Sequence, residues 1–319
     1  MKTPFLWIPG QGCDRAALAR MRRSFPRPRE PMGEAWFMGE TRAFFWELLG
    51  DLDTLSMEHL GPALYEIGSG TKNLGERNEW TDWFHYILAQ TLPRAHETYA
   101  FHSLVESLAT TFFLLYPEDI SREHYKGFRR DALDTLGRSM MNAECWDGDR
   151  VRIGAFLHRY YNEQAGAWFW RDASGDFAAS MFFCLKYLGS EEVAPWLRSV
   201  LAITDPHWRS QIIVWFVGAH DLLAGRFLDP SGYEVSDCPS LSWEASHLLK
   251  RDTRDGVNPH FLPRPNREAA LATLEAFMGD DLYLEWLCSI SEFDYLESEL
   301  ADLPERFREL YILDAPAPL

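Results

Sequence analysis

Carboxylates and histidines recur between residues 79 and 106, in a pattern that could supply a metal site. Glu79, Asp82 and His85 are spaced three residues apart, so a helix would carry them on one broad face. The same residue types continue along the chain as His96, His102 and Glu106. Metal sites built across two helices use carboxylate and imidazole ligands of this kind. Because no second clustered pair completes the set, we expect no metal here and expect the carboxylates to lie on a solvated helix face.

A second supply of reactive side chains lies in the irregular segment 226–265. Its polar candidates are Asp237, Cys238, Ser240, Ser242, His247 and His260. A Ser–His or Cys–His pair could act as a nucleophile, because the imidazole can take the proton of the hydroxyl or thiol. The sequence contains no GxSxG, Walker, GxGxxG or HExxH motif. We therefore expect no cofactor and assign no catalytic residues.

The C-terminal part combines carboxylates with aromatic side chains. Residues 275–305 contain ten Asp or Glu residues and no Lys or Arg. One interpretation is a docking face for a basic protein, in which aromatic anchors make the contact and carboxylates steer the encounter. The residues assigned to this face are Tyr283, Trp286, Glu292, Phe293, Asp294, Tyr295, Glu297 and Glu299. The alternatives are a solvated acidic face without a partner, or an internal contact with the arginines of residues 15–29.

Those arginines belong to an arm over residues 1–33 that is rich in Pro and Arg. They are Arg15, Arg20, Arg22, Arg23, Arg27 and Arg29, with no acidic residue between the first and the last. A basic arm can bind nucleic acid or pack on an acidic part of its own chain. The whole chain has 31 basic and 48 acidic residues, a net charge of -17, which repels phosphates and anionic membrane surfaces. We therefore expect the arm to pack internally and consider nucleic acid an unlikely class of partner.

The cysteines indicate a reducing compartment. The 5 cysteines are widely spaced and form no CxxC motif, so neither a disulfide framework nor a cysteine-rich zinc site is indicated. The apolar run near the N-terminus is too short for a signal peptide. No stretch approaches ~18 uninterrupted apolar residues, the length of a membrane span. These observations predict a soluble cytoplasmic protein and leave its oligomeric state open.

The residues that must position these candidates are organised around the stretch 191–218, which reads as two helices and a turn. Val193, Leu197 and Leu201 fall on one helical face. Asp205 is a natural N-cap with Pro206 at the first helical position, and a second apolar run follows. We expect this second helix to end near Gly218.

This stretch resembles a HEAT-type repeat, in which a helix, a short turn with Asp and a second helix opening with an apolar residue and Arg follow one another. The matching residues are Ala194, Leu197, Leu201, Asp205, Trp208 and Arg209. The resemblance implies a structural bond between Arg209 and Asp205. A partial copy is Phe128–Gly137, and its Arg129 lies two periods of about 40 residues before Arg209. The intermediate segment 175–180 departs from the pattern, because it has no Arg at the matching position.

Periodicity and turn residues predict further helices along the rest of the chain. We expect them over residues 35–49, 57–67, 102–116, 121–141, 147–161, 177–188, 266–278 and 282–290. The triplet Gly68-Ser69-Gly70 is expected to end the second of these helices. The aromatic segment 165–175 is expected to be a loop, and strand signals are too few to predict a sheet.

Together these patterns predict an all-α fold of stacked helix pairs, a HEAT-like α-solenoid with irregular ends. We divide it into the arm 1–33, a helical-repeat core 34–225, the excursion 226–265 and an acidic helical part 266–319. Stacked helices offer a large curved face, and the acidity suits a basic partner. We therefore predict a non-catalytic protein-binding protein, such as a scaffold or a bacterial inhibitor or immunity-type protein. The alternative is an enzyme with its site in the concave face or in the 225–265 loop.

Overall fold

Helices make up most of the chain, as the all-α prediction requires. The computed structural model describes residues 4–31, 46–95, 97–99, 102–120, 123–154, 160–162, 167–169, 173–232, 239, 241, 243, 245–251, 260–277 and 280–313. The α-helices are α1 (Arg15–Ser24), α3 (Met57–Leu74), α4 (Asn78–Thr91), α5 (Leu104–Leu115), α6 (Phe128–Asp134), α7 (Gly175–Tyr187), α8 (Ser190–Leu201), α9 (Pro206–Leu223), α10 (Arg264–Phe277), α11 (Asp280–Ile290), α12 (Asp294–Glu299) and α13 (Leu303–Arg308). Short 3-10 helices span Leu52–Thr54, Leu92–Arg94, Leu136–Met141, Ala143–Cys145, Pro230–Gly232 and Ser246–Leu249.

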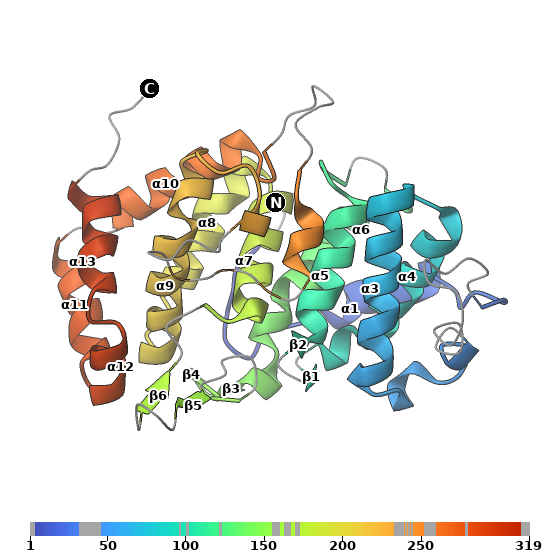
Figure 1. The fold of residues 1–319 in the computed structure, drawn as a ribbon, viewed down its shortest axis with the longest axis horizontal. Coiled ribbons are helices and arrows are strands. Elements are labelled where there is room, and N and C mark those ends of the chain that lie inside the picture. Colours follow the sequence, from blue (N-terminus) through green and yellow to red (C-terminus); the bar gives the residue numbers. More distant parts are fainter. Residues whose placement is uncertain are drawn as a thin grey trace.

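The helices are arranged in approximate chain order along the long axis of the molecule (Figure 1). Helices α3 and α4 lie at one end, α5 to α7 lie in the middle, and α11 to α13 lie at the other end. Helix α5 packs between α3 and α7, while α9 packs against α11 and α13. Helix α10 returns to pack on α8. Neighbours in the chain are therefore mostly neighbours in space.

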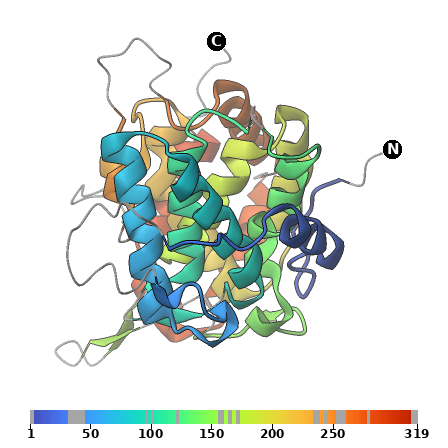
Figure 2. The ribbon, with the colours of Figure 1, turned by 90° about the vertical axis from the view of Figure 1, so that its right-hand side faces the viewer.

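The N-terminal segment is an exception to this order, because it enters the core far from its neighbours in sequence. Trp7 is only 1% exposed. Its ring meets those of Trp196 and Trp208 edge-on, with centroids 5.5 and 5.8 Å apart. Its indole N–H donates to the carbonyl oxygen of Gly137 at 2.7 Å. Figure 2, which looks onto the α3–α4 end, shows dark-blue α1 at one edge of that end. Residues 4–31 are thus an integral part of the packed structure.

The predicted helix pair at 191–218 is confirmed as α8 and α9. Asp205 is the N-cap of α9, and its carboxylate accepts a hydrogen bond from the Trp208 N–H at 2.9 Å. The predicted end at Gly218 is wrong, because α9 continues to Leu223. A Cβ at position 218 would lie 2.9 Å from the carbonyl oxygen of Pro239. The lack of a side chain at Gly218 therefore lets another segment pack closely on α9, and this glycine does not end the helix.

The triplet at 68–70 is likewise part of a helix, which corrects the predicted break. Helix α3 runs through it to Leu74 and ends before Gly75, whose φ is +84°. The ring of Trp80, from α4, lies on Gly70, where an added Cβ would be 2.7 Å from the ring. Glycine in this helix lowers its intrinsic stability, but lets α4 pack closely.

The described parts of the segment 147–161, residues 147–154 and 160–161, do not form the predicted helix. Strands β3 (Trp146–Asp147) and β4 (Arg150–Val151) form a hairpin whose turn contains Gly148 with φ +65°. Two more short antiparallel pairs join β1 (Thr98–Tyr99) to β2 (His102–Ser103) and β5 (Tyr160–Asn162) to β6 (Ala167–Phe169). The last strand falls in the segment predicted as an aromatic loop.

The predicted helix over 121–141 is also shorter than expected. Helix α6 begins at Phe128, after Gly127 with φ +96°, and a 3-10 helix replaces its continuation from Leu136. Ser121, the first residue of that predicted helix, lies outside the described residues. Most of the predicted helix over 35–49 also lies outside them.

Candidate functional site

His85, from the group of carboxylates and histidines weighed as a metal site, is a buried core residue of α4. Its ring stacks on Phe25 with centroids 4.5 Å apart, and its Nε2 shares a hydrogen bond with the Tyr116 hydroxyl at 2.7 Å. Burial, reinforced by the neighbouring His124, lowers the pKa of His85 to about 3. The imidazole is therefore neutral across the physiological range and holds α4 against the Phe25 and Tyr116 side chains.

The other members of this cluster are not gathered around His85. Asp82 is exposed on α4, Glu79 is half-buried, and Glu106 is buried on α5 beside a different helix. His96 and the side chain of His102 lie outside what the structure describes. Within the described residues, no group of three or more His, Cys, Asp or Glu side chains is placed to hold a metal ion. The absence of a metal remains a prediction.

Glu106 belongs instead to a buried acid pair that sequence analysis did not predict. Asp176, in the first turn of α7, is 2% exposed and accepts a hydrogen bond from the Ser103 hydroxyl. Burial, and then the adjacent Glu106, raise the pKa of Asp176 well above its ordinary value. Glu106 lies so close to Gly175 that an added Cβ there would overlap the carboxylate. The pair can therefore hold a proton between α5 and α7.

Lys186 is the second buried ionisable group that sequence reasoning missed. It lies in α7 with 3% of its surface exposed. Its Nζ donates to the carbonyl oxygen of Phe261 at 2.7 Å and lies 4.5 Å from the centre of the Phe261 ring. Burial, and then Arg251, lower the pKa of Lys186 to about 7, while Glu118 and Asp119 act in the opposite direction.

Lys186 also lines a cavity of about 320 Å³. The cavity lies between the segment after α5, the C-terminal end of α7 and the start of α10. Its lining residues are Glu118, Asp119, Ile120, Arg129, Lys186, Tyr187, Leu188, Pro263 and Asn266. Asn266 and Arg129 fix its walls, since each donates a hydrogen bond to a main-chain carbonyl at the end of α7. A partly neutral amine beside such a space is chemically distinctive, because exposed lysines are almost fully protonated at neutral pH.

A second cavity, of about 290 Å³, lies between α3, α5 and the 3-10 helix at 246–249. Small residues on the facing helices leave the space open, since a Cβ at Gly61 would meet no atom within 4 Å. Its walls are mainly apolar, with the buried Glu66 and the hydroxyl groups of Ser107, Thr110 and Thr111 among them. This composition suits a small, largely apolar molecule.

The structure describes only some of the candidate nucleophiles and histidines of the 226–265 segment. Asp237, Cys238, Ser240 and Ser242 lie outside the described residues. His247 is exposed and lies beside the ring of Tyr65 on α3, whereas His260 is half-buried near Phe227 and Arg267. The two histidines therefore belong to different surroundings.

In the predicted partner-binding set, the structure separates the aromatic residues from the carboxylates. Trp286 is 1% exposed and lies under the Arg209 guanidinium, 5.6 Å from the ring centre. Tyr283 is buried and donates a hydrogen bond to the carbonyl oxygen of Pro304. Phe293 and Tyr295 are half-buried and lie beside the ring of His207. These rings pack within the chain, so they do not form the exposed anchors that the sequence indicated.

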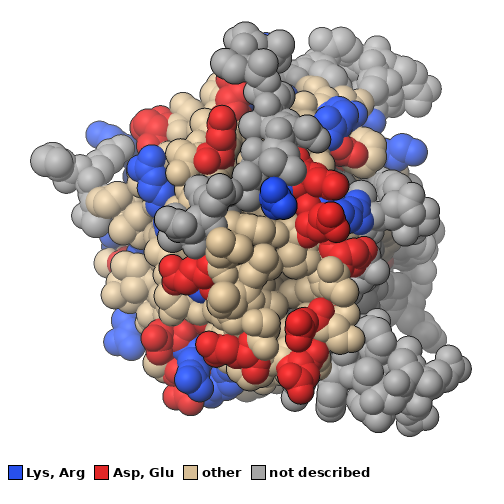
Figure 3. Space-filling view, turned by 90° about the vertical axis from the view of Figure 1, so that its left-hand side faces the viewer, with Lys and Arg blue, Asp and Glu red and all other residues tan. Residues whose placement is uncertain are grey.

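The carboxylates of the set do reach the solvent. Glu292, Asp294 and Glu297 are exposed, and Glu299 is half-buried. Together with other exposed residues they form what we call the C-terminal acidic surface: Leu284, Glu285, Glu292, Asp294, Glu297, Asp302, Glu305 and Glu309. Figure 3 looks onto this end and shows Asp and Glu side chains bordering a central uncharged area, with basic side chains interspersed.

Arg209 connects this end to α9. Its guanidinium donates to the Ser289 hydroxyl at 3.0 Å and forms an ion pair with Glu285 at 3.6 Å. The expected bond between the Arg209 and Asp205 side chains is not formed between these two described residues, which are joined by a main-chain hydrogen bond. The Asp205 carboxylate instead accepts hydrogen bonds from the main-chain N–H groups of Trp208 and Val151. Arg209 therefore fixes α11 to α9 instead of closing its own helix pair.

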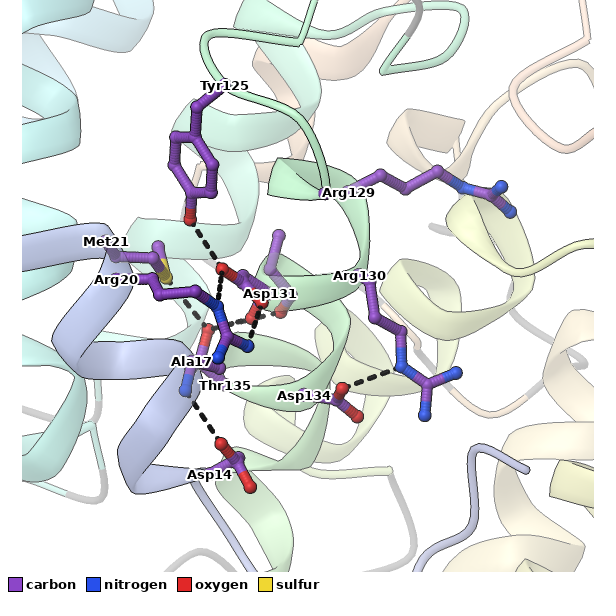
Figure 4. A network of polar contacts seen from close by, with 12 residues as sticks. Asp14, Ala17, Arg20, Met21, Tyr125, Arg129, Arg130, Asp131, Asp134 and Thr135 are labelled. Carbon is purple, nitrogen blue, oxygen red and sulfur yellow. Dashed lines mark hydrogen bonds and ion pairs between the residues drawn. The ribbon is translucent and has the colours of Figure 1, made fainter. Parts of the chain in front are cut away.

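The basic arm packs on its own chain, as predicted, but not on the C-terminal carboxylates. Arg20 forms two hydrogen bonds to buried Asp131 of α6, at 2.6 and 2.9 Å, and the Tyr125 hydroxyl donates to the same carboxylate (Figure 4). Arg22 and Arg27 donate to main-chain carbonyls of other segments. Arg20, Arg22 and Arg27 therefore bond to parts of the chain other than the C-terminal acidic surface.

Comparisons with protein-family models, with curated proteins and with solved structures each return no match to this chain. Among the helices that the structure describes, none combines the length and the apolar character that crossing a membrane requires.

Proposed function

We propose that this chain is a non-catalytic protein-binding protein whose C-terminal acidic surface docks a basic segment of another protein. The observation that carries the proposal is the arrangement in Figure 3, where carboxylates border an uncharged area. Leu284 is 57% exposed and stands next to exposed Glu285. A basic segment with one or two apolar side chains complements such a surface, because apolar contact supplies affinity and opposite charges supply orientation.

Long-range electrostatics favour the same class of partner. The chain carries a net charge of -17, so its field attracts basic proteins before contact. The exposed carboxylates lie on the C-terminal helices α11 to α13 or directly beside them, where they can speed association. Salt screens interactions between exposed charges beyond roughly 8 Å at physiological ionic strength.

Within this proposal the chain acts as a scaffold, or as a bacterial inhibitor or immunity-type protein in the cytoplasm. We keep the interpretation of α8 and α9 as a HEAT-like unit of an α-solenoid. It is supported by the helix pair itself, by the Asp205 cap and by the chain-order arrangement of the helices along the long axis. Stacked helices of this kind bind partners over extended surfaces.

The test compares the natural chain with two charge-reversed variants. One carries Glu292→Lys, Asp294→Lys and Glu297→Lys. The matched control carries Glu58→Lys, Glu76→Lys and Asp82→Lys, which are also exposed and belong to the α3–α4 end. Each protein is immobilised and then incubated at low salt with lysate of the source cells. The proteins that it binds are identified by mass spectrometry.

We expect a basic protein to be captured by the natural chain and by the control, and to be lost from the C-terminal variant. Its association rate should fall as NaCl is raised, while its dissociation rate changes less. Equal capture by both variants, or capture of no basic protein by the natural chain, contradicts the proposal.

A further inference from the structure

Lys186 lies in an environment that is unusual for a lysine. Its side chain is buried in α7, and its Nζ donates to a neutral main-chain carbonyl, that of Phe261. Among the described residues it forms no ion pair within 4.0 Å. The charged groups that shift the pKa of Lys186 are Arg251, Glu118 and Asp119, and Arg251 is already paired with Glu118. Burying an ammonium group without a close counterion is unfavourable, so this site favours the neutral amine.

The space beside Lys186 is large enough for an organic molecule. The cavity measures about 320 Å³, compared with roughly 30 Å³ for one water molecule. The carboxylates of Glu118 and Asp119 lie in the same lining as Lys186, so groups that can accept or return a proton are present. Nζ is bonded to Phe261 and Lys186 lines the cavity, so a ligand of the amine would enter from the cavity.

We propose that Lys186 is a nucleophilic amine that binds a small aldehyde or ketone in this cavity as a covalent imine. The neutral Nζ attacks the carbonyl carbon, and the electrons of the C=O π bond move to the oxygen, which takes up a proton. Nζ loses one proton, the hydroxyl takes up a second proton and leaves as water while the nitrogen lone pair forms the C=N bond, and loss of the second Nζ proton gives the neutral imine. One amine and one carbonyl compound thus give one imine and one water, without oxidation or reduction.

The acid–base chemistry of the site supports this step. With a pKa of about 7, about half of the Lys186 amine is neutral near neutral pH. An ordinary lysine is neutral in roughly one molecule in 2,500 under the same conditions. Nucleophilic lysines depend on this kind of desolvation. The inference goes beyond protein binding, because it assigns the chain a small-molecule site at a distance from the C-terminal acidic surface.

The test is reductive trapping on the full, folded chain. The protein is incubated near neutral pH with acetaldehyde and cyanoborohydride, which converts an imine into a stable secondary amine. Intact mass and peptide mapping then locate the added ethyl group. The other lysines are Lys2, Lys72, Lys126 and Lys250, and the last three are exposed, so the chain provides its own internal comparison.

We expect Lys186 to be labelled on the order of 100-fold faster than Lys72, Lys126 or Lys250, because its larger neutral fraction outweighs narrower access. Unfolding in urea should abolish the preference. Lys186→Met, which keeps the length of the side chain, should lose the fast label, whereas Lys126→Met should retain it. Labelling of the exposed lysines with Lys186 unmodified in the folded natural chain overturns the proposal, whether or not the Lys186→Met variant folds.

Discussion

The centre of the molecule and its C-terminal end both contain many ionisable side chains, but they place them differently. Around α5 to α7, Asp131, Asp176 and Lys186 are buried, and each is held by a hydrogen bond to another part of the chain. Over α11 to α13, carboxylates such as Glu292 and Asp294 are exposed. In the first region the ionisable side chains are packed inside the protein, whereas in the second they face solvent.

This difference decides what each region can do. A buried group has its pKa shifted by desolvation, so its chemistry differs from that of the same residue in water. An exposed carboxylate keeps its hydration and acts on other molecules through its field. The centre is therefore where reactive groups are found, and the C-terminal end is where an encounter with a basic partner is favoured.

The largest expected effect comes from removing a central aromatic residue that joins distant segments. Trp7→Ala should lower the free energy of unfolding by about 3–5 kcal/mol, because it empties a site packed against Trp196 and Trp208. Leu284→Ala, at the exposed C-terminal surface, should change it by less than about 0.5 kcal/mol. Urea denaturation measures both. A small effect of Trp7→Ala on the free energy of unfolding would contradict the packing of the N-terminal segment in the core.

The next effect concerns the pH dependence of stability. The unfolded chain protonates an imidazole near pH 6.5, but folded His85 does so only near its pKa of about 3. Between these values the unfolded state binds more protons, so stability should fall as the pH is lowered, by up to about 1.4 kcal/mol per pH unit.

His85→Phe keeps a ring next to Phe25 and removes this titration. Its stability should therefore fall less steeply than that of the natural chain between about pH 6.5 and 3. Denaturation curves recorded across this range give the difference between the two proteins. Parallel curves would mean that His85 takes up its proton without unfolding.

The smallest effect compares two aspartates in the two regions. Asp131→Asn should lower the free energy of unfolding by roughly 1.5–3 kcal/mol, because it weakens the charge-assisted hydrogen bonds to Arg20. Asp294→Asn, in the first turn of exposed α12, should cost less than about 1 kcal/mol. Thermal or chemical denaturation of the pair gives the comparison, and equal losses would contradict the distinction between the two regions.

The candidate site was only partly predictable. The acidic character of residues 275–305 could be read directly, and the exposed positions of Glu292, Asp294 and Glu297 agree with it. The burial of the aromatic residues could not be read from the sequence, because Trp286 and Tyr283 alternate there with carboxylates. In the structure these two rings face α9 and α13. Their pattern fits an internal helix face as well as a binding face.

Lys186 and Asp176 gave no signal that sequence reasoning could use. Each is a polar residue within or beside the apolar run of α7, and such residues are usually on the solvated side of a helix. Their burial results from segments far along the chain: Phe261 bonds to Lys186 from 75 residues away, and Ser103 bonds to Asp176 from 73 residues away.

The sequence by itself determined the helical class and several local details, because periodicity and capping depend on residues a few positions apart. Asp205 and Pro206 start α9 where the pattern predicts, and the apolar positions Val193, Leu197 and Leu201 are all buried. Tertiary structure decided which glycines lie at close contacts between segments instead of at helix ends, and which polar groups are buried. Gly70 and Gly218 look like helix ends in the sequence, but they admit Trp80, and Pro239 and Leu241, from other segments. Close packing and desolvation are properties of groups brought together from distant positions, so they appear only once the chain has folded.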